Sequence, residues 1–418
     1  MKKQAVISCP IDTYSGYGAR ARDFVKAFIE ARPDLDVRIL SQRWGNTRFG
    51  YLADHNEDDL ISRILPQLQT KPDVWVQITV PNEFQSVGHY NIGVTAGMET
   101  TIAHATWVQG VNKMDLTLVS SQHAKDVFLN SKFEMKDNNG QPQGLVEVTK
   151  PIEVLFEGVN TDVYKQVSSD FDLSMVKEKY AYLFVGHWLQ GDFGHDRKNI
   201  PYMIKTFLET FKGKMNRPAL ILKTQAATSS LMDKERILKK IEAVKKSVKG
   251  AGLPNIYVIH GEMSDSEMNS LYNHTKVKTM VSFTRGEGFG RPLLEFTTTG
   301  KPIIASGWSG QSDFLDVDKS FLLGGTLEKV HKSAAIKDMI LEEAAWFKPN
   351  DGEVANAWKV STKQYVKLLT NSKKQKSRTL REFTFNNMTD KLKEILDNNI
   401  EIVEQIQLNL PSLNLPQL

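Results

Sequence analysis

Short apolar runs recur along the chain and alternate with longer stretches whose apolar residues follow a helical period. This alternation is typical of parallel sheets whose strands are joined by helices. The runs fall into two series separated by a polar stretch. The predicted strands are Gln4–Pro10, Asp36–Leu40, Asp73–Val80, Asn91–Gly97 and Asp115–Ser121 in the first series, and Tyr180–Gly186, Ala219–Thr224, Asn255–Gly261, Lys278–Thr284 and Pro302–Ser306 in the second.

The two series predict an α/β protein of two doubly wound, Rossmann-like domains facing across a cleft. The segment Pro151–Ser174 is polar and lacks a helical period, so we interpret it as the crossing between domains. We expect a first domain over residues 1–165 and a second over 175–350, followed by helices over 351–405 that return toward the first domain and an extended tail over 406–418. Ligands of such folds bind at the carboxyl ends of the strands.

Composition narrows the class of protein. The 418 residues are 40% hydrophobic and 24% charged, and the net charge of +4 is too small to indicate a nucleic-acid partner by itself. The one cysteine, Cys9, excludes an internal disulfide and any multi-cysteine metal site, which fits a cytoplasmic protein. No apolar run approaches the roughly 20 residues of a membrane span.

In the stretch Thr284–Thr299, three glycines, Gly286, Gly288 and Gly290, accompany two glutamates, Glu287 and Glu295. Exposed amides of a glycine loop before a helix favour a phosphate. A carboxylate accepts hydrogen bonds from vicinal hydroxyls, as on a sugar or a ribose. By spacing alone, a glycine turn followed by surface acids explains the stretch equally well. It is neither a dinucleotide fingerprint nor a P-loop.

Within this stretch, EGFGRPLLE resembles the E-x7-E motif of retaining GT-B glycosyltransferases of family four. IHGEMSDSEMNSLYN, KPIIASGWSGQSDFL and VLFEGVNTDVY resemble other segments of the same family. From Val6 to Leu315 the chain is most similar in appearance to glycosyltransferases of large tailed bacteriophages. The resemblance implies a GT-B fold with an acceptor-side first domain and a second domain that binds a nucleotide sugar.

The resemblance also implies site residues in the second domain. It assigns the donor diphosphate to the catalytic cations Arg197 and Lys198, which would stabilise charge on the leaving phosphate. It assigns the donor sugar to Glu287, also catalytic, and the ribose to Glu295. Without the resemblance, Arg197 and Lys198 would be interpreted as exposed residues at the start of a helix. Backbone amides would meet the donor phosphates at Gly288, Phe289 and Gly290.

Candidate residues of the first domain follow two of its predicted strands. Gly16 and Gly18, in TYSGYGAR, are expected to line the donor side of the cleft, against the alternative of a simple tight turn. Arg20 is a weaker candidate for the same cleft, on the acceptor side. In GMETTIAHATW, Glu99 is a catalytic candidate and His104 an acceptor-binding one, although a lone histidine is more often structural.

A metal requirement is not expected, because Arg197 and Lys198 can neutralise a diphosphate. The resemblance implies no permanently bound cofactor, only a nucleotide sugar as cosubstrate. Asp-x-Asp strings, which hold a divalent ion in the other main glycosyltransferase fold, can arise by chance among 49 acidic residues. They are Asp34/Asp36, Asp170/Asp172 and Asp316/Asp318.

The expected activity is retaining transfer of a hexose or pentose from a nucleotide donor, with a UDP-sugar favoured, to an acceptor hydroxyl. If the phage resemblance holds, one candidate acceptor is a hydroxymethylated pyrimidine in double-stranded DNA within the host cytoplasm. The basic runs Lys239–Lys249 and Ser372–Arg378 would then assist DNA binding. A saccharide, lipid or protein acceptor is the alternative, and a non-catalytic GT-B-like binding module is another. The sequence does not determine the oligomeric state.

Overall fold

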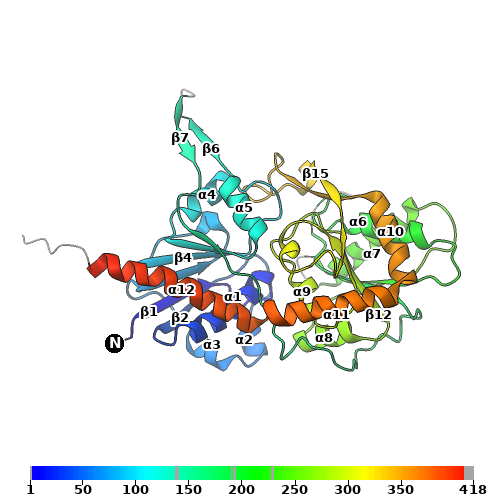
Figure 1. The fold of residues 1–418 in the computed structure, drawn as a ribbon, viewed down its shortest axis with the longest axis horizontal. Helices are drawn as coiled ribbons and strands as arrows, with labels where there is room; N and C mark the ends of the chain where they lie inside the picture. The colour runs from blue at the N-terminus through cyan, green and yellow to red at the C-terminus, as the bar shows by residue number, and fades with distance from the viewer. Residues whose placement is uncertain (1, 137–140, 190, 192–193, 227–229, 409–418) are drawn as a thin grey trace, which may run out of the picture.

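Two parallel sheets, each of six strands, form the centres of two domains that lie side by side (Figure 1). The computed structural model describes residues 2–136, 141–189, 191, 194–226 and 230–408. All the predicted strands are present, and the α/β class is confirmed. In spatial order the strands are β2 (Asp36–Ser41), β1 (Gln4–Cys9), β3 (Val74–Ile78), β4 (Tyr90–Thr95), β5 (Leu116–Val119) and β8 (Ile152–Val154) in the first sheet, and β11 (Ile256–Ile259), β10 (Ala219–Lys223), β9 (Ala181–Val185), β12 (Val277–Ser282), β13 (Ile303–Ser306) and β14 (Phe321–Leu323) in the second.

The sequence patterns missed the last strand of each sheet. Both β8 and β14 have only three residues, too few to show a period, and β8 lies within the segment interpreted as the domain crossing. Two antiparallel hairpins were also missed, and the first projects from the first domain (Figure 1). They are β6 (Phe133–Lys136) with β7 (Pro142–Val146), and β15 (Gly325–Lys329) with β16 (Ala345–Pro349).

Helices cover both faces of each sheet, which explains why β3 and β4 are buried along their whole length. None of the described helices is long and apolar enough to cross a membrane. The α-helices are α1 (Gly16–Ala31), α2 (Tyr51–Asp54), α3 (Asp58–Ser62), α4 (Ala105–Val111), α5 (Gln122–Asn130), α6 (Ile200–Phe211), α7 (Leu231–Ser247), α8 (Asp265–Asn273), α9 (Arg291–Thr297), α10 (Asp351–Lys363), α11 (Tyr365–Glu382) and α12 (Phe385–Leu408).

The strand order determines where ligands can bind. In the first sheet the order reverses between β1 and β3, and in the second between β9 and β12. Crevices at the carboxyl ends of strands beside such a reversal are the usual ligand sites of open α/β sheets. The loops that follow β1, β9 and β12 contain most of the candidate residues, so the topology places these residues at the expected position.

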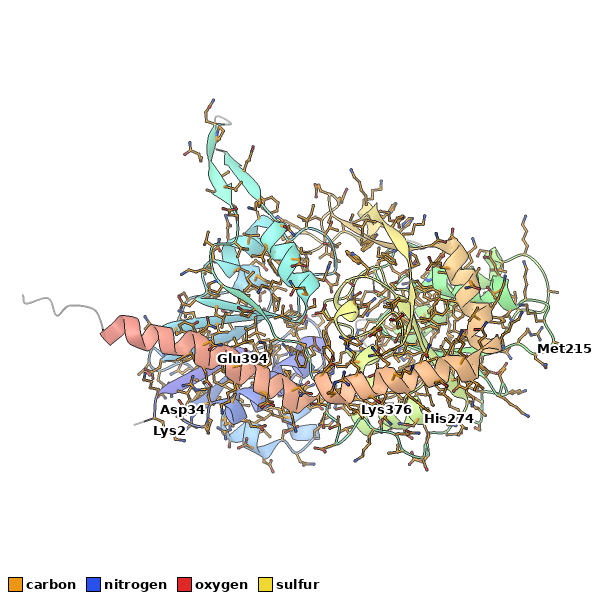
Figure 2. All side chains as sticks on the ribbon, in the orientation of Figure 1. Lys2, Asp34, Met215, His274, Lys376 and Glu394 are labelled. Carbon is orange, nitrogen blue, oxygen red and sulfur yellow. The ribbon has the colours of Figure 1, made fainter. Side chains whose placement is uncertain are left out.

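The C-terminal helices span both domains. Lys376 on α11 lies over the second domain and Glu394 on α12 lies over the first (Figure 2). Met388 and Leu392 of α12 are fully buried in the same apolar cluster as Phe24 and Phe28 of α1. Residues 406–408, predicted as extended, end α12, and the predicted tail beyond them lies outside the described residues.

Because α12 completes the core of the first domain, Leu392→Ala should lower the free energy of unfolding by about 2–5 kcal/mol. Lys393→Ala on the exposed side of the same helix should change it by no more than about 0.5 kcal/mol. Urea denaturation of both variants measures the difference. Equal stabilities would show that α12 does not contribute to that core.

Candidate active site

A buried carboxylate lies between two cations at the centre of the cleft. Glu287 Oε1 accepts a hydrogen bond from Lys198 Nζ at 2.6 Å, and its Oε2 accepts one from Arg197 Nη1 at 3.1 Å. The three side chains are 10%, 16% and 23% exposed, in the order Glu287, Lys198, Arg197. Although burial opposes ionisation of Glu287, Lys198 and Arg197 lower its pKa to about 2. The carboxylate is therefore permanently charged near neutral pH.

Two neighbouring strands place this cluster. Arg197 and Lys198 follow β9, and Glu287 follows β12, the strand paired with β9 across the order reversal. The backbone N–H of Arg285 donates to the carbonyl oxygen of Arg197 at 2.8 Å and so joins the two loops. The N–H of Glu287 donates to Ser309 Oγ at 2.9 Å, which fixes the loop from its other side.

The first domain meets this loop backbone to backbone. A Cβ atom added at Gly286 would lie 1.9 Å from the carbonyl oxygen of Glu99, and one at Gly288 would lie 2.2 Å from that of Ala96. Ser120 Oγ also donates to the carbonyl oxygen of Gly288 at 3.1 Å. The sequence analysis explained these glycines by the close approach of a ligand to the loop. In this structure they also allow the backbone of the first domain to approach the loop closely.

Glu99 belongs to the same cluster. Its carboxylate lies 3.7 Å from Arg197 Nη1, across the domain boundary, and its side chain is 31% exposed. Arg197 thus contacts carboxylates of both domains. Of the two carboxylates near Arg197, that of Glu99 is more exposed than that of Glu287, which suits a group that binds a second substrate.

A cavity of about 290 Å³ opens between the domains beside this cluster. Two polar atoms of its lining, Thr224 Oγ1 and Gln225 Oε1, are buried without a hydrogen-bond partner among the described groups. The lining residues are Tyr14, Ser15, Gly16, Ala19, Arg22, Tyr51, Val185, Gly186, His187, Lys223, Thr224, Gln225, Glu262, Met263, Met268 and Pro292.

Thr224 and Gln225 were missed by the sequence analysis. The available signal was their position, directly after the apolar strand β10 and at the same sheet edge as Arg197. A polar pair at the carboxyl end of a buried parallel strand is a candidate for ligand contact on that ground alone. No motif marks them, and for this reason they received no role.

A smaller cavity of about 40 Å³ lies beside the cations. Arg197 and Lys198 line it together with apolar residues that include Ile336 and Ile340. His187 lines both cavities, and burial followed by repulsion from Lys198 lowers its pKa to about 4, so its ring is neutral near pH 7. The cations therefore line one of two cavities that share His187 in their linings.

Glu295 lies on α9, which begins after Gly290 in the left-handed region at φ +103°. Its side chain is 9% exposed. Arg291 Nε donates to its Oε1 at 2.9 Å, and the Tyr272 hydroxyl donates to its Oε2 at 3.1 Å. Burial raises the pKa of Glu295 to about 7, against the opposing effect of Arg291. Glu295 is not among the residues that line the larger cavity, but Pro292, one turn earlier on the same side of α9, is.

The glycines predicted to line the donor side differ in their surroundings, and the contact predicted for the Phe289 amide stays a prediction. A Cβ atom at Gly18 would lie 2.2 Å from the carbonyl oxygen of Thr13, so this glycine permits a tight turn, whereas Gly16 has open space and lines the cavity. The Phe289 ring is 3% exposed and packs on Phe314 at 5.0 Å between centroids. A donor can meet Phe289 only through its backbone.

The acceptor role predicted for Arg20 does not fit its position. Its guanidinium is fully enclosed, and Nη1 and Nη2 donate to the carbonyl oxygens of Phe156 and Leu155, so it holds the domain crossing against α1. His104 caps α4, where its Nδ1 accepts from the Thr106 N–H at 3.2 Å, and its Nε2 lies 3.5 Å from Asp338 of the second domain. Its acceptor role stays a prediction.

One aspartate of each Asp-x-Asp string has a partner within the protein. Asp34 pairs with Arg32 at 2.7 Å, Asp170 accepts from Ser270 at 2.6 Å, and Asp316 pairs with Lys319. Among the described residues, no group of three or more His, Cys, Asp or Glu side chains could hold a metal ion. The expectation that the reaction needs no metal stays a prediction.

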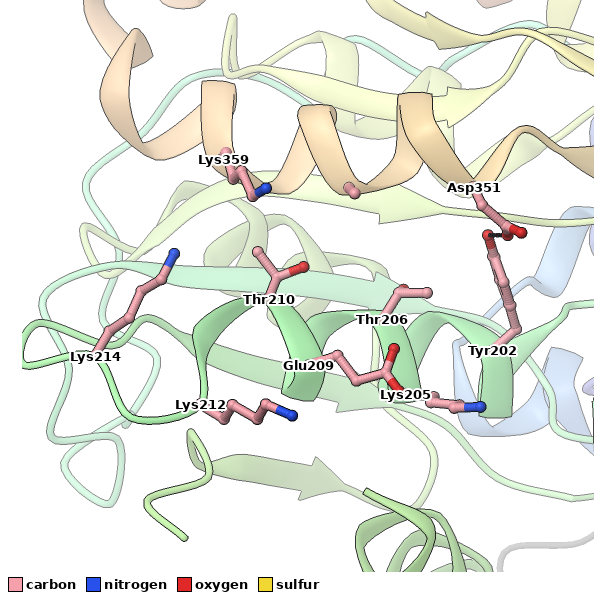
Figure 3. A pocket seen from close by; sticks show the side chains of 10 residues that line it. Tyr202, Lys205, Thr206, Glu209, Thr210, Lys212, Lys214, Asp351 and Lys359 are labelled. Carbon is pink, nitrogen blue, oxygen red and sulfur yellow. Dashed lines mark hydrogen bonds between the residues drawn. The ribbon is translucent and has the colours of Figure 1, made fainter. Parts of the chain in front are cut away.

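A larger groove of about 780 Å³ lies away from the cluster, between α6 and α10 (Figure 3). Its walls are helix side chains, including Lys205, Thr210 and Lys359, and it contains none of the predicted site residues. The position of the predicted site residues therefore favours the two smaller cavities near the cluster rather than this groove.

Comparisons with known proteins agree with the fold. Residues 239–343, which include Glu287 and Glu295, match the family model described as "Glycosyl transferases group 1". No curated protein sequence matches the chain. The match does not reach Arg197, Lys198 or the first domain.

Solved structures resemble nearly the whole chain. HepE of Anabaena, in complex with UDP and glucose, is 11% identical with a TM-score of 0.61, over 95% of this chain and 100% of that chain. Sucrose-phosphate synthase from Thermosynechococcus elongatus is 12% identical with a TM-score of 0.62, over 96% and 100%. The trehalose 6-phosphate synthase of Burkholderia multivorans is 9% identical with a TM-score of 0.61, over 98% and 99%. The predicted GT-B fold is confirmed, whereas the phage relationship and the retaining outcome stay predictions.

Replacing Glu287 by glutamine should separate binding from transfer. The two cations lose the carboxylate that now competes with a diphosphate, so UDP should bind about tenfold more tightly, the equivalent of one charge-assisted hydrogen bond. Sugar transfer should slow by about a hundredfold to a thousandfold. Calorimetric titration and a transfer assay test the two effects. Weaker UDP binding together with normal transfer would contradict this assignment.

The raised pKa of Glu295 predicts pH-dependent nucleotide binding. Its ordinary value is 4.5, so between pH 4.5 and about 7 the folded protein holds a proton that the unfolded chain has released, and stability falls as pH rises through this window. A ribose hydroxyl prefers the ionised carboxylate, so the affinity for UDP should increase as pH rises through about 7. Calorimetry across this range measures it. Glu295→Gln is the control. In this variant the ionisation of the UDP phosphate near pH 6 still makes binding depend on pH, whereas the part of the pH dependence that comes from Glu295 should disappear.

Proposed function

We propose that this protein is a glycosyltransferase that moves a sugar from a nucleotide-diphosphate donor to an acceptor hydroxyl. The observation that carries the proposal is the convergence of Arg197, Lys198 and Glu287 near a cavity of the second domain and a larger cavity between the two Rossmann-like domains. The polar residues Thr224 and Gln225 in the lining of the larger cavity support a nucleoside there, because its base and ribose carry groups that form hydrogen bonds.

The contacts suggest a division of roles. The nucleoside occupies the larger cavity, and the diphosphate replaces Glu287 as the main partner of Arg197 and Lys198. The Glu287 carboxylate, released from one or both cations, then accepts hydrogen bonds from hydroxyls of the donor sugar. Because the cations are held before the reaction, charge that develops on the leaving phosphate meets a prepared positive environment.

The acceptor enters from the side of the first domain. Glu99, the more exposed carboxylate of the cluster, is placed to bind an acceptor hydroxyl near Arg197. With retention, as the family resemblance implies, the departing phosphate takes the proton of the attacking hydroxyl on the same face of the sugar. Contact between the domains at Gly286 and Gly288 excludes water from the donor and limits its hydrolysis.

UDP is the favoured nucleotide, since HepE of Anabaena was solved with UDP and with UDP-glucose. The acceptor is a finer question. The names of the sucrose-phosphate and trehalose 6-phosphate synthases favour a saccharide or a sugar phosphate. A hydroxymethylated pyrimidine in DNA is the second candidate, carried by the phage resemblance and by exposed lysines on α7. Both belong to one reaction class and differ only in what the first domain binds.

The direct test is release of UDP or GDP from a panel of nucleotide sugars. Each donor is incubated alone, with sugars and sugar phosphates, with unmodified DNA, and with DNA that contains hydroxymethylcytosine. We expect acceptor-dependent release from one UDP-sugar, with the sugar mass appearing on that acceptor. No binding of any donor would favour the non-catalytic module instead.

Lys198→Gln should reduce this release by about a hundredfold or more, because the leaving phosphate loses a buried cation. Lys359→Gln, an exposed lysine of the groove in Figure 3, is the matched control and should stay within about twofold of the unchanged protein. A similar loss in both variants would mean that total charge, rather than the position of Lys198, is responsible.

A further inference from the structure

Ser309 has a backbone conformation that residues with a side chain rarely adopt. Its φ and ψ are +68° and −157°, in a region that is essentially restricted to glycine. Such a conformation is unfavourable for a serine and persists only where the surrounding structure fixes it. Ser309 is 4% exposed and follows β13, the strand that pairs with β12. The serine must therefore contribute something that glycine would not.

The side chain of Ser309 makes contacts that glycine cannot make. Its Oγ accepts a hydrogen bond from the N–H of Glu287 at 2.9 Å and donates to the carbonyl oxygen of Trp308 at 2.6 Å. The next residue, Gly310, donates its N–H to the carbonyl oxygen of Glu287 at 3.0 Å. Two consecutive residues thus bind both backbone polar groups of Glu287, and these contacts restrict rotation of the backbone at that position.

Packing on either side opposes a relaxation of Ser309. Before it in the chain, the Trp308 ring lies against the ring of His123, on α5 of the first domain, at 4.6 Å between centroids. After it, a Cβ atom at Gly310 would lie 2.2 Å from the carbonyl oxygen of Gly288, so the chain packs directly on the glycine loop. A more favourable conformation of Ser309 would therefore displace either the domain boundary or that loop.

The backbone of Glu287 determines where its carboxylate lies. The carboxylate oxygens are bound by Lys198 at 2.6 Å and by Arg197 at 3.1 Å, so a shift of the backbone changes both contacts. A misplacement of about 1 Å in a group that acts on the transition state can slow a reaction by about a hundredfold. The contact with Ser309 is therefore placed to affect transfer without touching a substrate.

We propose that Ser309 is a positioning residue for sugar transfer: its hydroxyl fixes the backbone of Glu287, and its unfavourable backbone conformation is retained for the sake of that contact. The inference rests on the proposed function, since it concerns the carboxylate proposed to bind the donor sugar. It implies that glycine, which suits this backbone better, would give a folded but slower enzyme.

The test compares Ser309→Gly with Ser309→Ala. Both variants lose the hydroxyl, but only glycine also relieves the backbone. Urea denaturation should therefore give Ser309→Ala a lower midpoint than the unchanged protein, and Ser309→Gly a higher midpoint than Ser309→Ala. Despite this difference in stability, kcat for transfer should fall by about tenfold in both variants, the equivalent of one hydrogen bond. The affinity for UDP, which lacks the sugar, should stay within about threefold.

A double substitution shows whether Ser309 acts through Glu287. In the Glu287→Gln background the carboxylate is already lost, so adding Ser309→Gly should lower kcat by no more than about twofold. Asn56→Gly is the matched control, because Asn56 also has a positive φ of +55° but is exposed, between α2 and α3 of the first domain. This control should leave kcat within about twofold of the unchanged protein.

The opposite results overturn the inference. They are an unchanged kcat in Ser309→Gly, an equal loss in the Glu287→Gln background or in Asn56→Gly, and a loss of UDP affinity as large as the loss of kcat. A Ser309→Gly variant that does not fold, or that is no more stable than Ser309→Ala, also overturns it, because the hydroxyl would then serve the fold. In all these cases the proposed function stands. Absence of transfer by the unchanged protein with every donor and acceptor overturns the proposed function itself.

Discussion

The close approach of two backbones at Gly286 and Gly288 is the constraint on which the site depends. These residues touch the carbonyl oxygens of Glu99 and Ala96, and any side chain there would force the domains apart. Because they are glycines, the loop that carries Glu287 can reach the first domain, and Glu99 comes within 3.7 Å of Arg197. The absence of side chains at these two positions thus allows the cluster to be assembled from two domains.

Their electrostatic surroundings give Glu287 and Glu295 different pKa values, although the two glutamates lie close together in the sequence. Two cations surround Glu287 and overcome the effect of its burial, so the pKa is about 2. Glu295 shares one arginine with Asp23, and burial prevails, so its pKa is about 7. One local motif therefore supplies two different groups. Glu287 is a fixed negative charge beside the two cations that are predicted to bind the diphosphate, and Glu295 is a titratable group beside the predicted ribose position. The difference arises from neighbours that are distant in the sequence.

The remaining contacts favour a closed arrangement of the domains. Arg48 reaches Glu262, and Arg291 reaches Asp23, on either side of the larger cavity. The C-terminal helices connect the domains a second time, because α11 lies on the second domain and α12 is buried in the core of the first. Opening the cleft breaks the ion pairs but can leave the helical connection intact. This combination suits a donor site that must open, fill and close.

Local patterns were sufficient for the strands and for the residues within motifs. A buried parallel strand is a continuous apolar run, and a glycine turn with flanking charges is visible in a short window, so Glu287 and Arg197 could be chosen from the sequence. The sequence by itself therefore determined the fold class and the candidate loops. Only the tertiary structure decided that Arg20 supports the domain crossing, that Thr224 faces the cavity, and that Asp23 contacts Arg291. These facts depend on contacts between residues far apart in the chain, and such contacts leave no periodic or local signal.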